Sequence, residues 1–219
     1  MDNLSPYANP APEPWARLVG GRIGAEAVKV LLSMEPGNLA PVGARAKVLQ
    51  IRRRVPAPDR VERSYELVKK DPKEVGHTEW AFAKEIVLLD ALVAKAPVEE
   101  VEVQAVQIGP AIFLANPAEM FCQFSLDLKN KSPFKLTFPV GYANGFVAYV
   151  PTEEAFGEHG GGYETRLTSC SNLEVTAGRQ IVETSLELAG QMTPGEVPQP
   201  PPAPPFGNGP RPPVPPELE

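Results

Sequence analysis

Apolar side chains recur with helical spacing in two long segments. Over residues 15–34 they are spaced by three and four positions up to a Pro-Gly-Asn break, which predicts an amphipathic helix. Over residues 79–95 the stripe Phe82, Ile86 and Leu89 predicts a second helix with one buried face. The same spacing predicts shorter helices over residues 59–70, 118–129 and 176–191.

The period changes to two in other segments, which predicts strands with one covered face. Residues 44–55 and 98–109 alternate in this way, and residues 111–117 follow after Gly109 and Pro110, so the second and third segments are predicted to form a hairpin. Residues 134–143 predict a further strand. This mixture predicts an α/β fold of mixed α+β layers, in which helices pack on a sheet.

Proline marks both ends of the chain. Residues 1–14 include SPYANPAPEP, which predicts a loop. From Pro194 onward twelve of 26 residues are proline, so residues 193–219 are predicted to form a disordered, extended polyproline II tail. Such a tail serves as a linker or, through PxxP spacing at Pro201 and Pro204, as a ligand for an SH3 or WW domain. One domain is therefore expected over residues 15–192.

Charge and composition exclude several classes of protein. The net charge is −6 with basic residues dispersed, so no nucleic-acid partner is expected, and the run Arg52–Arg54 is interpreted as an exposed strand end. An apolar run of transmembrane length and a signal peptide are both missing from the sequence, so neither a membrane span nor export is indicated. Cys122 and Cys170 make no disulfide framework and are expected to be free.

Short motifs with a known mechanism do not assign a function. The sequence has no GxGxxG, GxxxxGK, CxxC, HExxH or GxSxG. The HGGG at residues 159–162 is interpreted as a flexible loop, since an oxyanion loop would need a nucleophile elbow. His77 and His159 are the two histidines, and their spacing indicates no metal cluster. Composition and spacing alone reach no further than a soluble mixed α/β domain.

Four segments in order carry more information: SPY at residues 5–7, NPAEMF at 116–121, GYANGFVAYVPTEEAF at 141–156 and GGYE at 161–164. Their order resembles the second half of the neutral (non-lysosomal) ceramidase family, which carries a PGEF-like segment, then G-x-x-N-x-Y-x-x-Y-x-T-T-x-E-E-Y, then RYE. The match is strongest over residues 104–165. That family consists of zinc-dependent amidases, often exported, which cleave the N-acyl bond of ceramide to sphingosine and a fatty acid.

The resemblance implies roles for three residues. Glu119 and Tyr149 match the family's metal-binding glutamate and tyrosine, and Ser5 matches its essential serine in N-x-G-D-x-S-P. A carboxylate and a phenolic oxygen are hard ligands, and a catalytic zinc lowers the pKa of bound water and polarises an amide carbonyl. A serine beside the metal would act as a nucleophile or as a donor to the oxyanion.

The departures from the family pattern shape the functional hypothesis. The family's two zinc-binding histidines lie upstream of the serine motif and have no counterpart here, and Asn3, Ala118, Phe146 and Gly162 replace family residues. We therefore expect the C-terminal part of a ceramidase-like domain for a lipid-like N-acyl amide substrate, inactive without an N-terminal half. An exposed apolar surface is expected where that half would dock. The alternatives are a free-standing, non-catalytic α/β domain with a partner-binding or linker tail, and an unrelated fold with chance similarity.

Overall fold

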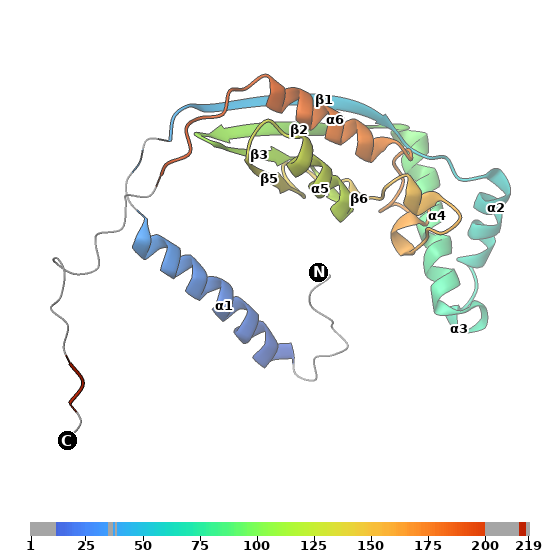
Figure 1. Ribbon diagram of the computed structural model, residues 1–219. Coiled ribbons are helices and arrows are strands. Elements are labelled where there is room, and N and C mark those ends of the chain that lie inside the picture. Colours follow the sequence, from blue (N-terminus) through green and yellow to red (C-terminus); the bar gives the residue numbers. More distant parts are fainter. Residues whose placement is uncertain (1–11, 35–36, 38, 200–214, 218–219) are drawn as a thin grey trace. The chain divides into compact units, whose positions relative to one another are not determined.

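The computed structural model describes residues 12–34, 37, 39–199 and 215–217 (Figure 1). By its contacts the chain divides into two compact units, Met1–Asn38 and Leu39–Glu219. Ser5 and most of the loop predicted over residues 1–14 lie outside the described residues, as does most of the proline-rich segment.

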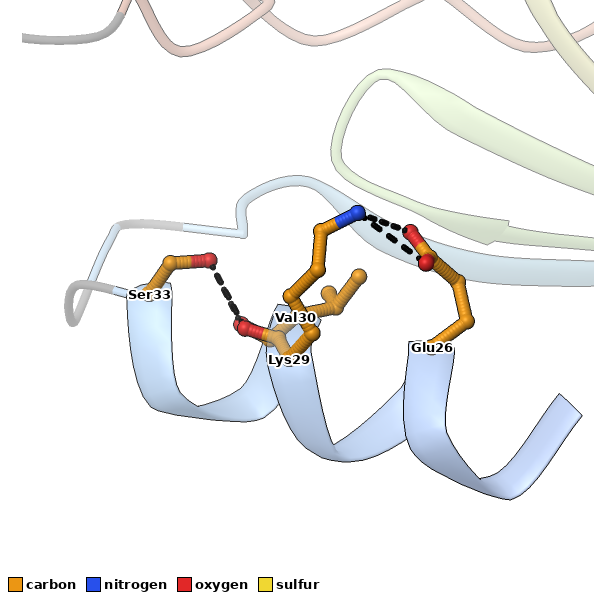
Figure 2. Close-up of polar contacts among 4 residues, drawn as sticks. All are labelled: Glu26, Lys29, Val30 and Ser33. Carbon is orange, nitrogen blue, oxygen red and sulfur yellow. Dashed lines mark hydrogen bonds and ion pairs between the residues drawn. The ribbon is translucent and has the colours of Figure 1, made fainter. Parts of the chain in front are cut away.

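The first unit contains one long helix, α1 (Pro12–Ser33), which begins slightly earlier than the predicted helix and ends one residue before its predicted end. Figure 2 shows polar contacts near its end: the Lys29 ammonium lies 2.8 Å from a Glu26 carboxylate oxygen, and the Ser33 hydroxyl donates to the Val30 carbonyl at 2.9 Å. The serine thereby satisfies a carbonyl of the last turn, which has no partner further along the helix. No helix among the described residues is long and apolar enough to cross a lipid bilayer.

The second unit is built on a four-stranded sheet in the order β1-β2-β3-β5. Its strands are β1 (Val42–Arg52), β2 (Val98–Ile108), β3 (Ala111–Ala115) and β5 (Leu136–Val140). The pairs β1·β2 and β2·β3 are antiparallel, and β3·β5 is parallel. The predicted hairpin, with its turn at Gly109 and Pro110, is confirmed, and so is the mixed α/β fold.

Helices cover one face of this sheet. The two helices are α5 (Cys122–Lys131) and α6 (Ala177–Gly190), and both lie over the same face (Figure 1). Every second residue of β2 points into this layer, so Val101, Val103 and Ala105 are fully buried and belong to the same core cluster as Phe124 and Ile181. Burial of aliphatic side chains of this kind stabilises a fold by about 1.5–3 kcal/mol each.

The opposite face of the sheet carries an apolar row that runs across all four strands. Ala44, Val106, Phe113 and Phe138 are register partners in succession, and the last two rings stack with centroids 5.1 Å apart. Phe138 is 46% exposed. The exposed apolar surface where a missing half would dock stays a prediction, and Val106 and Phe113 of this row are half-buried.

Three helices lie where β1 ends and β2 begins (Figure 1). They are α2 (Pro58–Leu67), α3 (Pro72–Val75) and α4 (His77–Lys95), and the first two pack against the third. The sequence predicted α4 from its apolar stripe, and the buried Ile86 and Leu89 confirm it. The predicted helix over residues 59–70 ends earlier in the structure, at Leu67, and α3 follows as a separate turn that begins at Pro72.

The arginine run at the end of β1 does not form an exposed strand end, as the sequence had suggested. Arg52 is exposed, but the Arg53 guanidinium contacts Glu99 and donates to the Ala96 carbonyl at 2.9 Å. Arg54 donates to the Ser171 carbonyl at 2.7 Å, and burial lowers the pKa of both inner guanidinium groups. Two of the three arginines therefore donate to partly buried backbone carbonyls and so join distant segments of the chain.

Candidate functional site

A second, two-stranded sheet holds the residues that the resemblance singled out. It consists of β4 (Ala118–Met120) and β6 (Ala148–Val150), which pair in parallel. Residues 118–120 were predicted to begin a helix; they form a strand instead, and helix α5 starts only at Cys122. In this pair Glu119 and Tyr149 are register partners. Side chains of register partners project to the same face of a sheet, so the carboxylate and the phenol share one side of it.

The loop between β5 and β6 wraps over the start of β4. The Tyr142 amide donates to the Ala118 carbonyl at 3.2 Å, and the Val147 amide donates to the Pro117 carbonyl at 3.0 Å. A side chain at Gly141 would place its Cβ 2.8 Å from the Ala118 carbonyl oxygen, so the close approach of the two segments requires glycine. This loop brings an additional tyrosine to the face that carries Glu119.

Three residues of this region have the left-handed backbone conformation, which residues other than glycine rarely adopt. Tyr142, Asn144 and Ala148 have φ angles of 53°, 56° and 55°. The Asn144 amide donates to the Glu102 carboxylate on β2 at 3.1 Å, which ties the loop to the main sheet. Left-handed backbone outside glycine costs free energy and concentrates at functional sites.

The Glu119 carboxylate accepts a hydrogen bond from the Tyr142 hydroxyl. This bond, together with partial burial and the nearby negative charge, raises the pKa of Tyr142 to about 12. The ring of Tyr142 stacks on Phe146 with centroids 5.6 Å apart. The phenol therefore stays protonated and holds the carboxylate in one orientation, while an aromatic neighbour fixes the ring.

Tyr149 has its own phenol partner. The Tyr163 ring, in the short 3₁₀ helix η2 (Tyr163–Thr165), meets the Tyr149 ring edge to face with centroids 5.5 Å apart. A hydrogen bond with Tyr149 and the charge of Glu164 raise the pKa of Tyr163 to about 12. The Tyr149 amide donates to the Cys170 carbonyl at 3.0 Å, so the strand is held from its other side as well. Cys122 and Cys170 are free and exposed, as expected.

One carboxylate and three phenols thus gather around β4 and β6. They are Glu119, Tyr142, Tyr149 and Tyr163. These are hard oxygen donors, but a catalytic zinc has about three protein ligands, and the sequence indicated only two at this place. Within the described ranges no three histidine, cysteine, aspartate or glutamate side chains come together to hold a metal ion. Glu119 and Tyr149 alone are therefore fewer ligands than a catalytic zinc has.

Sequence reasoning missed Tyr142 and Tyr163. Both follow a glycine inside segments that had been singled out, at Gly141-Tyr142 in GYANGF and Gly162-Tyr163 in GGYE. A tyrosine after a turn-forming glycine is a weak signal by itself, because the three-residue strands that bring these rings together leave no periodic pattern.

Comparisons with known proteins add little to this geometry. No protein-family model matches the chain, and no curated protein sequence matches it. Among solved structures, a chain of one titled "Ceramidase complexed with C2" is similar at 21% sequence identity over 46% of this chain, with a TM-score of 0.34. The similar region makes up 16% of that ceramidase chain. At this TM-score the similarity does not establish a shared fold, and no family is assigned to the chain.

Proposed function

We propose that Glu119 and Tyr149 contribute to the zinc site of a ceramidase-like amidohydrolase that cleaves a lipid-like N-acyl amide. One observation carries the proposal: two residues that the motif resemblance picks out as ligands, thirty positions apart in the chain, are register partners on neighbouring strands. An unrelated pair of residues at this separation has no reason to share one face of a three-residue sheet.

The surrounding side chains support the roles of this pair. Tyr142 donates to Glu119, and the Tyr163 ring meets the Tyr149 ring edge to face. A hydrogen-bonding partner that orients the ligand, as Tyr142 does for Glu119, is typical of metal sites. When bound, zinc would supply Lewis-acid activation of the amide carbonyl and of a water molecule.

The proposal includes an incomplete ligand set. Two oxygen donors are fewer than the three that a catalytic zinc needs, so the remaining ligands would come from polypeptide outside the described residues, such as an N-terminal half of the domain. Ser5 would then act beside the metal as a nucleophile or oxyanion donor. We expect residues 1–219 to show no amidase activity without those ligands.

Zinc titration of the chelator-treated protein by calorimetry tests the proposal. We expect weak, saturable binding that Glu119→Gln and Tyr149→Phe each weaken by about tenfold or more. Tyr65→Phe is a matched control. The Tyr65 hydroxyl on α2 donates a hydrogen bond to the Asp90 carboxylate on α4 at 3.2 Å, so this variant also removes a phenol that is paired with a carboxylate. This control should leave zinc affinity unchanged.

Two results would contradict the proposal in different ways. Zinc affinity that is the same in the wild type and both variants would remove the metal site and favour the non-catalytic domain. Hydrolysis of a fluorogenic N-acyl amide by the wild type with zinc, abolished in Glu119→Ala, would support the enzyme but contradict the incomplete ligand set.

A further inference from the structure

A cavity of about 120 Å³ lies beside α2 and α4, apart from the site described above. Its rim carries Arg60 and Arg63 of α2, Glu79 of α4, and Arg166, which follows η2. Apolar residues form the rest of its wall: Leu67, Phe82, Ala83 and Ile86. The volume is several times the roughly 10–15 Å³ that one water molecule needs, so a tetrahedral oxyanion fits.

Two of the three arginines that line this cavity are exposed side chains of α2. Arg60 and Arg63 make no hydrogen bond or ion pair within the described part of the chain. Arg166 lies over the Phe82 ring, 3.4 Å from its centroid, and 4.0 Å from a Glu79 oxygen. Stacking on an aromatic ring holds a guanidinium in place, while its N–H groups, which lie in the plane of the guanidinium, remain free to bind an anion.

The charges around the cavity favour a dianion. Three arginines and one glutamate leave a net local charge of +2, in a chain whose net charge is −6. The positive charge extends further, because Arg60 is close enough to lower the pKa of Arg54, after the larger effect of burial. Positive charges that lie close together repel one another. An anion bound between them would offset that repulsion.

A serine adds a hydroxyl to the wall. Ser64 is 4% exposed and lines the cavity. A hydroxyl in the wall of a cavity can donate a hydrogen bond to an anion that binds there.

We propose that this cavity binds a phosphate group, held by Arg60, Arg63 and Arg166 and by the Ser64 hydroxyl. A phosphate monoester carries a charge of about −1.5 to −2 at neutral pH, which matches the local charge, and has three terminal oxygens for three guanidinium groups. A carboxylate would leave one positive charge without a counterion and two oxygens for three arginines. The apolar wall suits the organic substituent of an ester. This inference does not rest on the proposed zinc site.

Inorganic phosphate is the first probe, titrated at constant ionic strength and followed by calorimetry and by the NMR signals of the arginine side chains. We expect one saturable site, with affinity lowered by about tenfold or more in Arg60→Gln and in Arg63→Gln. Arg63→Lys keeps the charge and should bind better than Arg63→Gln. Arg45→Gln, which alters an exposed arginine on β1 outside the cavity, is the control and should bind like the wild type.

Several results would overturn the inference. The first is the absence of saturable phosphate binding by the wild type. The second is phosphate binding by both glutamine variants that is as tight as that of the wild type. The third is acetate binding as tight as phosphate binding. Circular dichroism shows whether each variant is folded. If a glutamine variant does not fold, Ser64→Ala gives the same test, because loss of the hydroxyl should weaken phosphate binding.

Vesicles separate the two sources of a phosphate group. One set contains phosphatidylcholine alone and the other adds phosphatidic acid, whose headgroup is a phosphate monoester. Binding to the second set only, lost in Arg63→Gln, would support the site and assign a lipid headgroup. Phosphate binding without vesicle binding would support the site and assign a small soluble phosphate.

Discussion

Glu119 and Tyr149 face the same side of a parallel pair of strands, and the bond between the Tyr142 hydroxyl and the Glu119 carboxylate fixes the orientation of the acid. The three residues come from two separate segments. Their meeting depends on the loop that passes over β4, since the Tyr142 amide is bonded to the carbonyl of Ala118. The geometry of this group can therefore be tested through the acid, through the phenol and through the loop.

Tyr142 should titrate well above an ordinary tyrosine. Its pKa is raised from 10.0 to about 12, first by the hydrogen bond with Glu119. Because the folded-state pKa is raised, this contact stabilises the fold fully below pH 10, and the stabilisation is lost as the pH rises from 10 to about 12. Titration of the phenol by NMR in metal-free protein measures the shift.

Glu119→Gln should move that titration back toward 10, because the negative charge is removed while a weaker hydrogen bond remains. Tyr142→Phe identifies the signal, since its titration disappears. A wild-type Tyr142 that titrates like a free tyrosine would show that the bond to Glu119 does not persist in solution.

Gly141→Ala should destabilise the fold by about 1–3 kcal/mol, because its Cβ would lie 2.8 Å from the Ala118 carbonyl oxygen. The loop must then shift, so the pKa of Tyr142 should fall as well. Gly190→Ala is the control, since a Cβ at this end of α6 meets no described atom within 4 Å, and it should change stability little or raise it slightly. Urea unfolding measures both, and equal effects of the two changes would contradict the close approach at Gly141.

Arg53→Met should cost about 3 kcal/mol in the free energy of unfolding, because it leaves Glu99 and the Ala96 carbonyl without their partner in a largely enclosed place. Arg52→Met removes a neighbouring, exposed arginine and should change stability by less than about 0.5 kcal/mol. Chemical denaturation of both variants makes the comparison. Similar small losses would show that Arg53 is solvated, as the sequence had suggested.

Phe138→Ser should reduce binding of a hydrophobic dye, because it interrupts the apolar row on the open face of the main sheet and removes the stacking partner of Phe113. Leu126→Ser removes a similarly exposed apolar side chain from α5, outside this row, and should leave dye fluorescence nearly unchanged. If the wild type binds no dye, the row is covered in solution.

Periodicity in the sequence was enough to find the main sheet and its covering helices. Residues such as Ile86 and Val103 repeat at the spacing of their element, and the hydrophobic effect acts on that repeat directly. The strand at residues 118–120 was missed because a three-residue strand is too short to show a period, and its partner lies thirty positions away. Tertiary pairing there outweighs the helical spacing of the residues that follow.

The candidate site was predicted only in part for the same reason. A resemblance in motifs pointed to Glu119 and Tyr149, whereas Tyr142 and Tyr163 join them through a loop crossing and a 3₁₀ turn that local patterns do not encode. The arginines after β1 were misread because an alternating strand gives no sign that the next segment will fold over it.

The predicted tail is attached to the body beyond the last helix. The buried Gln107 side chain donates to the carbonyls of Gly109 and Thr193 at 2.8 and 2.7 Å, and the Gly195 amide donates to the Gly109 carbonyl at 3.0 Å. Thr193 and Gly195, where the proline-rich segment begins, therefore lie at the tip of the β2–β3 hairpin. A partner that binds the proline-rich segment would be held near the tip of this hairpin. Its local concentration there would depend on the number of residues between Gly195 and the bound motif.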